Sequence, residues 1–170
     1  FNFNNKGFLL EITLTYLMSE LIAKRPTWAE INLDNLTFNF HSVKNFIGQN
    51  IKFMAVVKAD GYGHNAVLCA RRLEAEDVDW FGVALPEEGI ELRQAGIKKP
   101  ILCLGSFWLG QAKLLIDNNL TPVIYQIPKA EELNLAASER GLIANIHIKV
   151  DTGMGRIGVR FDEVREFAEK

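Results

Sequence analysis

Along residues 27–170, segments with the hydrophobic pattern of a strand alternate with segments that have the pattern of a helix. The segment 27–33 alternates apolar and polar residues as a half-buried strand does, and Asp34 can cap a following helix that ends near Gly48. After it, apolar runs predict buried strands and helix-period segments separate them. The expected strands are 53–59, 80–85, 100–105, 121–126 and 144–151, and the expected helices are 66–75, 87–95, 109–118, 128–140 and one that begins at Phe161.

This alternation of strand and helix with short connections is typical of parallel strands with helices packed outside them. About five β/α units follow residue 53, whereas a closed (β/α)8 barrel of the TIM type takes ~250 residues. We therefore expect an α/β fold in which residues 27–170 form the N-terminal portion of such a barrel, left incomplete within this sequence. An open doubly wound sheet could be built from the same units and is the alternative.

The first seventeen residues do not share this pattern. They are partly apolar, but Glu11 interrupts them and the uninterrupted run is too short to span a bilayer. A basic region followed by a small-residue cleavage site, which would indicate a signal peptide, is not found. We expect residues 1–17 to be a non-native or disordered extension, the natural start to be Met18, and the location to be the cytoplasm.

Composition adds two exclusions. The net charge is -2 and 24% of residues are charged, so no nucleic-acid or anionic-membrane partner is expected. Cys69 and Cys103 belong to no CxxC pair and to no histidine cluster, so we expect two buried, reduced thiols and no metal site.

The first segment with candidate catalytic or binding residues is Val56-Val57-Lys58-Ala59-Asp60-Gly61-Tyr62-Gly63-His64. Lys58 ends an apolar strand, and the carboxyl ends of strands carry the active site in a β/α barrel. Partial burial makes a lysine amine less basic and more nucleophilic, which suits Schiff-base formation. A lysine that only extends to solvent is the alternative. Tyr62 between Gly61 and Gly63 favours the functional interpretation, because a glycine-rich turn leaves backbone N–H groups free for an anion.

The second segment is His147-Ile148-Lys149-Val150-Asp151-Thr152-Gly153-Met154-Gly155-Arg156. Strand alternation places His147, Lys149 and Asp151 on one face, which we expect to point into the barrel while the apolar face meets the outer helices. Ionisable groups are costly in a barrel interior, so a site for a charged ligand is favoured over mutual pairing. Arg156 is suited to bind a phenolate or carboxylate oxygen.

The sequence assigns no functional role to the other ionisable residues. We expect Glu87, Glu88 and Arg93 to form a solvated helix face. His64 could cap the next helix or support the site, and both interpretations stay open.

The two segments resemble the alanine racemases. AVVKADGYGH is similar to the cofactor-lysine motif of that family, and HIKVDTGMGR is similar to its later barrel-strand motif. The opening RPTWAEINLDNLTFN also resembles the start of the family, so the resemblance covers about residues 25–170. One departure is Asn65, where many members have glycine.

The resemblance implies a cofactor and a reaction. Pyridoxal 5'-phosphate would be bound covalently to Lys58, Tyr62 would contact its phosphate, and Arg156 would contact its phenolic oxygen near the substrate carboxylate. Lys149 would be carbamylated, which would turn a charge that repels Arg156 into one that attracts it. Lys58 would be one general base in the interconversion of L-alanine and D-alanine, which supplies D-alanine for peptidoglycan.

The resemblance also implies parts that this sequence does not match. It implies a homodimer with a C-terminal β-domain that strand 27–33 would join, and a second base, a tyrosine, from the partner's β-domain. We therefore expect these 170 residues alone to be inactive. A racemase for serine or another small amino acid, a non-catalytic pyridoxal-phosphate-binding barrel protein, and a plain α/β domain remain as alternatives.

Overall fold

The computed structural model describes residues 28–48 and 50–170. The chain divides into two units, residues 1–31 and 32–170, and the elements described below belong to the second. The expectations for residues 1–17 and for a start at Met18 fall outside the described residues. None of the helices in the described part is long and apolar enough to cross a membrane.

The first described helix, α2 (Leu33–Ile47), begins two residues earlier than predicted. Asn32 is its N-cap and accepts a hydrogen bond from the Asn35 amide at 2.9 Å, while Asp34 lies within the first turn. The helix ends at Gly48, as expected. Residues 28–32 form no strand, which differs from the prediction for 27–33. Alternation alone does not make a strand, because a ladder also needs a neighbouring strand to pair with.

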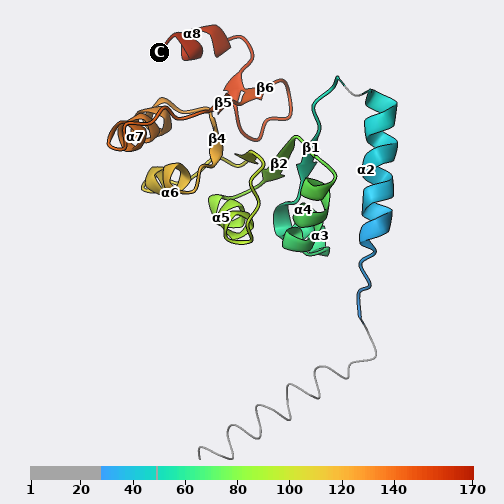
Figure 1. Ribbon diagram of the computed structural model, residues 1–170. Helices are drawn as coiled ribbons and strands as arrows, with labels where there is room; N and C mark the ends of the chain where they lie inside the picture. The colour runs from blue at the N-terminus through green and yellow to red at the C-terminus, as the bar shows by residue number, and fades with distance from the viewer. Residues whose placement is uncertain (1–27, 49) are drawn as a thin grey trace, which may run out of the picture. The chain divides into compact units, whose positions relative to one another are not determined.

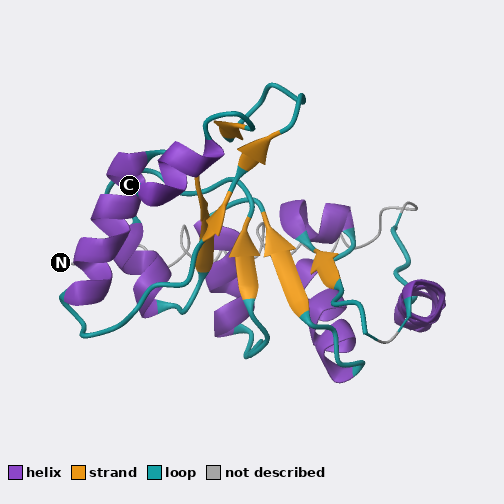
Figure 2. Ribbon diagram, turned by 90° about the horizontal axis from the view of Figure 1, so that it is seen from above, coloured by secondary structure: helices purple, strands orange, loops and turns teal. Residues whose placement is uncertain are grey.

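Five parallel strands form the sheet, in the order β1-β2-β3-β4-β5 (Figures 1 and 2). They are β1 (Met54–Val56), β2 (Trp80–Val83), β3 (Ile101–Cys103), β4 (Thr121–Ile124) and β5 (His147–Ile148). The connecting helices are α3 (Lys58–Gly63), α4 (Ala66–Ala75), α5 (Pro86–Gln94), α6 (Ala112–Asp117) and α7 (Ile127–Ser138). A parallel pair, β6 (Val150–Asp151) and β7 (Val159–Arg160), and helix α8 (Val164–Glu169) follow.

The strand order separates the two predicted folds. A doubly wound sheet reverses its strand order at a switch point, whereas a β/α barrel adds each new strand beside the last. Here the order in space is the order in sequence, which is the barrel pattern. The α/β prediction with parallel strands is confirmed, and the expected strand 144–151 is divided into β5 and β6.

One face of the sheet is buried under the helices. It carries the fully buried side chains Phe81, Val83, Ile101, Cys103 and Ile124, which are the centre of the hydrophobic core. Ala55 and Val57 continue this face on β1, so Met54 and Val56 lie on the opposite one, as the alternation predicts. Val56 is 38% exposed.

That opposite face is concave. The register places Trp80 of β2 and His147 of β5 on it, three strand intervals apart. In a flat sheet three intervals measure about 14 Å, yet the two rings meet edge to face with centroids 5.5 Å apart. The sheet therefore curves toward this face, as the wall of a barrel does.

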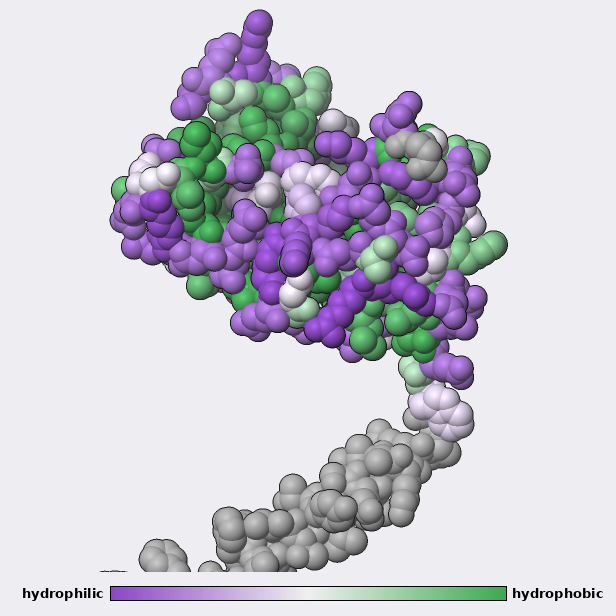
Figure 3. All heavy atoms as spheres, in the orientation of Figure 1, coloured by the Kyte–Doolittle hydropathy of each residue, from purple (hydrophilic) through white to green (hydrophobic). Residues whose placement is uncertain are grey.

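The last strand is less covered than the sequence predicts. Ile148 pairs with the fully buried Ile124 and so shares its face, but Ile148 is 37% exposed. Ile146 is 42% exposed, and Figure 3 shows hydrophobic side chains at the surface near β5 and α8. The prediction that Ile146 and Ile148 meet the outer helices is therefore only partly met. The physical reason is that β5 is the edge strand of the described sheet, with no further β/α unit beside it among residues 28–48 and 50–170.

Candidate active site

The four predicted site residues all follow the carboxyl ends of strands. Lys58 and Tyr62 come after β1, Lys149 lies between β5 and β6, and Arg156 lies in the loop from β6 to β7. Because the strands are parallel, Lys58, Tyr62 and Lys149 lie at one edge of the five-stranded sheet, the edge that carries the active site in β/α barrels. Arg156 follows β6, which pairs with β7 in a separate two-stranded sheet. β1 and β5 are the two ends of the five-strand row.

The chain after Lys58 makes a left-handed helical turn. Ala59, Asp60, Gly61 and Tyr62 have φ values from +51° to +63°. A left-handed conformation costs roughly 1–2 kcal/mol for each residue with a side chain. A Cβ at Gly61 would also lie 3.3 Å from the Ala66 backbone, so this position additionally requires a close approach. Strain of this kind is concentrated at functional sites, where the surroundings enforce it.

Local hydrogen bonds hold the turn in place. The Gly61 amide donates to Val57 O at 2.9 Å, and the Ala66 amide donates to the Asp60 carboxylate at 2.8 Å, which caps α4. His64 Nδ1 lies 3.0 Å from Gly61 O and donates to it in the tautomer that carries the proton on Nδ1. Of the two open interpretations of His64, support of the site is the one that the structure favours.

The Lys58 amine has no anionic partner in the part of the chain that the structure describes. Its Nζ lies 5.8 Å from the centroid of the Tyr62 ring, and within residues 28–48 and 50–170 it makes no ion pair or hydrogen bond. The Tyr62 side chain is 59% exposed. The structure thus brings the unpaired Lys58 amine close to the Tyr62 phenol ring. No hydrogen bond or ion pair in the described part links these two residues to Lys149 or Arg156.

A glycine lets apolar side chains pack closely on the concave face beneath this edge. A Cβ at Gly82 would lie 3.1 Å from Met54 Sδ and 3.3 Å from both Val56 Cγ2 and Leu104 Cδ1. Only the absence of a side chain at Gly82 lets these apolar groups come together. The donor set therefore fits an aldehyde cofactor with a flat ring and a phosphate, since it offers a free amine, a phenol hydroxyl and an apolar surface.

The second motif forms a loop folded around one carboxylate. The Asp151 carboxylate accepts hydrogen bonds from the amides of Gly153 and Gly155, each at 2.9 Å, and these bonds hold the pKa of Asp151 below its ordinary value. Lys149 is fixed through its backbone, because its amide donates to Ile124 O at 2.9 Å and its carbonyl accepts from the Val159 amide at 2.8 Å. Arg156 is exposed, and its guanidinium makes no hydrogen bond to another described residue.

The prediction of a solvated helix face on α5 holds for Glu87, which is exposed, but not for Glu88 and Arg93, which are partly buried and hydrogen-bonded to backbone groups. Glu88 accepts hydrogen bonds from the amides of Ala59, Ala84 and Leu85. Glu87 accepts from Gln111 Nε2 at 2.7 Å. Arg93 donates to four backbone carbonyls, those of Ile97, Lys99, Asn118 and Asn119. These partners lie on loops far away in the sequence, which a helical pattern does not reveal. One available signal was the glutamate at the third position of a helix that starts with proline, a capping position.

The two cysteines supply no nucleophile. Both are free and buried, as predicted. Burial, together with the negative charges of Glu88 and Glu87, raises the pKa of the Cys103 thiol to about 12, and burial raises that of Cys69. Among the described residues, no group of three histidine, cysteine or acidic side chains is arranged to hold a metal ion.

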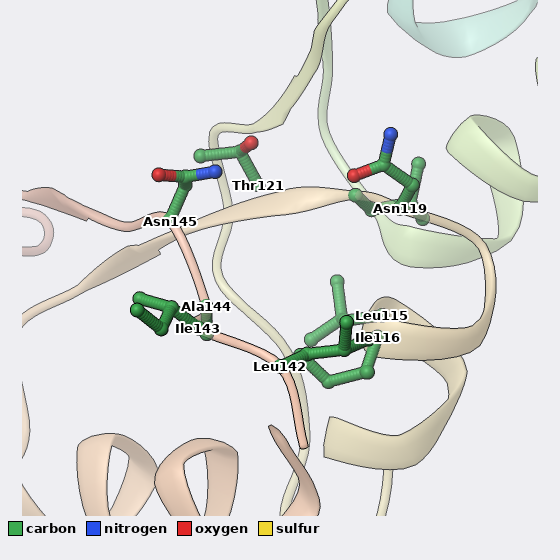
Figure 4. Close-up of a pocket in the computed structure, with 9 residues that line it drawn as sticks. Leu115, Ile116, Asn119, Thr121, Leu142, Ile143, Ala144 and Asn145 are labelled. Atoms are coloured by element: carbon green, nitrogen blue, oxygen red, sulfur yellow. The ribbon is translucent and has the colours of Figure 1, made fainter. Parts of the chain in front are cut away.

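A small pocket lies away from this edge. Its cavity is about 50 Å³, with Asn119, Thr121 and Asn145 on one side and Leu115, Ile116 and Leu142 on the other (Figure 4). Thr121 begins β4 and Asn145 precedes β5, so the pocket is at the amino-terminal end of the sheet. That end contributes to stability in β/α barrels, and we assign the pocket no catalytic role.

A row of sequential parallel strands with helices between them defines the class: the first units of a β/α barrel, with a lysine at its carboxyl edge that is unpaired within the described residues. Comparison with known proteins identifies the family. The sequence profile of the alanine racemase N-terminal domain matches residues 31–170, and the chain belongs to that family.

Individual relatives agree with this assignment. The chain is 47% identical to an alanine racemase of Halothermothrix orenii over 146 residues, which cover 86% of this chain and 38% of the relative. An alanine racemase structure from Clostridium difficile 630 matches with a TM-score of 0.81 and 46% identity, covering 86% of this chain and 39% of that one. The structure from Bacillus anthracis with bound L-Ala-P matches with a TM-score of 0.77 and 32% identity, covering 85% and 38%.

The extent of these matches bears on the fold and on the cofactor. The chain spans less than two-fifths of the length of the curated relatives that it matches. Its fold is that of the N-terminal, TIM-barrel domain of the family, of which it contains five sequential strands. The family uses pyridoxal phosphate, which agrees with the donor set around Lys58.

Proposed function

We propose that the protein containing these residues interconverts L-alanine and D-alanine, with pyridoxal phosphate held by Lys58. The observation that carries the proposal is the uncommitted Lys58 amine at the carboxyl end of the first barrel strand, fixed by a strained left-handed turn. The names of the relatives support the choice of alanine as substrate.

Lys58 has two roles in this proposal. Its Nζ binds the cofactor aldehyde, and once released it exchanges a proton with the substrate α-carbon as a general base. When bound, the cofactor supplies an electron sink that makes this proton acidic. The position of the amine beside Tyr62, without a carboxylate partner, keeps it available for both roles.

In this proposal Tyr62 and Arg156 bind and orient the cofactor, and Arg156 also binds the substrate. The exposed Tyr62 hydroxyl would donate to the cofactor phosphate, and the Arg156 guanidinium would hold the phenolic oxygen and the substrate carboxylate. Lys149 would react with carbon dioxide to give a carbamate and a proton, so that its charge attracts Arg156. The support is placement: both residues flank the loop organised by Asp151.

The complete protein is proposed to be a cytoplasmic homodimer that supplies D-alanine for peptidoglycan. The second base, which must act on the opposite side of the α-carbon, is proposed to be a tyrosine of the partner subunit. The concave sheet supports this division, because the described residues supply one general base at its carboxyl edge.

A racemisation assay tests the proposal. The longest natural chain containing these residues is incubated with pyridoxal phosphate and L-alanine in deuterated water, and D-alanine and α-deuteration are measured. Lys58→Ala should lower the rate by at least about 10²-fold, whereas Lys52→Ala, which removes an exposed amine at the start of the same segment, should leave it unchanged. Activity retained by Lys58→Ala would contradict the proposal. Preference for serine would favour the alternative substrate, and cofactor binding without turnover would favour a carrier protein.

A further inference from the structure

We infer that Glu88 is a positioning residue that fastens the turn after Lys58 to the neighbouring strand and thereby sets the direction of the Lys58 amine. This inference rests on the proposed function, because it concerns the residue that would hold the cofactor.

The two carboxylate oxygens of Glu88 accept hydrogen bonds from different loops. Oε1 accepts from the Ala59 amide at 2.8 Å, and Ala59 is the residue directly after Lys58. Oε2 accepts from the amides of Ala84 and Leu85 at 2.7 and 3.1 Å, at the end of β2. One side chain thus joins the first catalytic segment to the loop between β2 and α5.

The location of this link matters because the Lys58 turn is strained. Ala59 has φ +51°, and within the described residues its amide donates to no backbone carbonyl. Hydrogen bonds to a charged acceptor are stronger than neutral ones, so Glu88 can offset part of the cost of the left-handed conformation. Without it, the strand end could relax and Lys58 would turn with it.

The other end of the link is rigid. Ala84 O accepts from the Gly105 amide at 3.0 Å, and a Cβ at Gly105 would lie only 2.5 Å from that oxygen. The loop after β2 is therefore pressed against the loop after β3. Glu88 also lies in the first turn of α5, where the helix dipole favours a negative charge. The carboxylate is held independently of the turn that it fastens.

The substitution Glu88→Gln isolates the contact with the turn. An amide has one acceptor oxygen, which can keep both Ala84 and Leu85 only if its NH₂ group faces the Ala59 amide. Two donors then oppose each other beside Lys58. Glu87→Gln is the matched control, because it removes the same charge one residue away and its carboxylate contacts Gln111 instead.

The experiment uses the longest natural chain containing these residues, loaded with pyridoxal phosphate. Cofactor affinity, the visible absorbance of the Lys58-bound cofactor, and the pH midpoint of that absorbance are measured for the wild type and both variants. We expect Glu88→Gln to weaken cofactor binding about tenfold and to shift the pH midpoint, while Glu87→Gln matches the wild type. A loss of stability alone would not move the pH midpoint of the folded fraction.

Equal affinity and an equal midpoint in all three proteins would overturn the inference. Failure of the proposed function looks different, because the wild type itself would then carry no cofactor on Lys58. If Glu88→Gln does not fold, hydrogen exchange in the wild type decides the matter. A slow Ala59 amide, on a residue that is itself exposed, supports the link to Glu88, and an unprotected Ala59 amide overturns it.

Discussion

Backbone amides, rather than partner side chains, hold the acidic residues around this site. Asp60 accepts from Ala66, Glu88 from Ala59 and Asp151 from Gly153. Each carboxylate therefore fixes a loop conformation, and among the described residues Lys58 and Arg156 have no ion-pair partner. At the residue scale, the acidic groups shape the loops that carry the proposed cationic site residues.

Asn65 shows how a residue with a side chain is accommodated where the resemblance led us to expect glycine. It has φ +66°, a conformation that favours glycine, and its side chain accepts from the Leu68 amide at 2.9 Å as the N-cap of α4. We expect Asn65→Ala to lower the free energy of unfolding by about 1–3 kcal/mol, because it loses the cap and keeps the strain. Urea denaturation should show a much smaller loss for Asn65→Gly, and equal losses would contradict this account.

Asp151 predicts a pH dependence. Hydrogen bonds from Gly153 and Gly155 lower its pKa in the folded protein, so the stability that it contributes is complete above its ordinary value of 3.8. That contribution is lost as the pH falls through the lowered pKa. The difference in unfolding free energy between the wild type and Asp151→Asn should be constant near neutral pH and shrink below about 3.8. A difference that persists undiminished in strong acid would contradict the assignment.

Sequence reasoning selects some of the residues at this site and misses others, for a physical reason. Lys58, Tyr62, Lys149 and Arg156 lie in short motifs whose residue types suggest their chemistry, and their roles stay predictions. Glu88 lies in an ordinary polar helix pattern, and only folding brings it to Ala59, 29 residues away. A side chain whose partners are backbone amides of another loop leaves little trace in composition or spacing.

At the scale of the elements, α5 joins consecutive β/α units. Its Glu88 binds the loop before it, and its Arg93 donates to carbonyls of the loops that lead into β3 and β4. Partial burial lowers the pKa of the Arg93 guanidinium, which nonetheless stays charged and makes bonds of the charge-assisted kind. The helix thus covers the sheet and also joins neighbouring loops through the hydrogen bonds of Glu88 and Arg93.

Arg93→Met should reveal this role. It keeps an apolar side chain of similar reach but removes four hydrogen bonds, so we expect the free energy of unfolding to fall by about 2–4 kcal/mol. Arg71→Met is the control, because Arg71 donates only to Ala95 O on the exposed surface. Chemical denaturation that finds the two variants equally stable would count against the role of Arg93.

The ends of the strands depend on which backbone groups pair with neighbouring strands. This pairing cannot be read from the sequence. The predicted strand 53–59 is cut at Val56, because the chain turns left-handed after Lys58. The predicted strand 144–151 divides where Lys149 directs its amide to β4 and its carbonyl to β7. The helices other than α3, whose hydrogen bonds are local, were predicted to within a few residues, whereas α3 was not predicted as a helix.

At the scale of the whole molecule, the sheet is a curved wall with two free edges. β1 and β5 each have one strand neighbour within the described sheet. The chain spans less than two-fifths of its relatives, so most of the residues that such an enzyme supplies lie outside this sequence.

These 170 residues alone should therefore show no alanine racemisation. The reason is that one general base cannot both remove and return a proton on opposite sides of a carbon. The measurement compares D-alanine formation by the purified, homogeneous 170-residue chain and by the longest natural chain under identical conditions. Clear turnover by the shorter chain would contradict this expectation.

Whether Lys58 carries the cofactor is the central claim, and peptide mapping tests it most directly. The longest natural chain containing these residues is folded, incubated with pyridoxal phosphate, reduced with borohydride, digested and analysed by mass spectrometry. The account predicts a phosphopyridoxyl group on Lys58. A folded protein that carries no label on Lys58 would contradict the account and would leave an α/β domain whose lysine only extends to solvent.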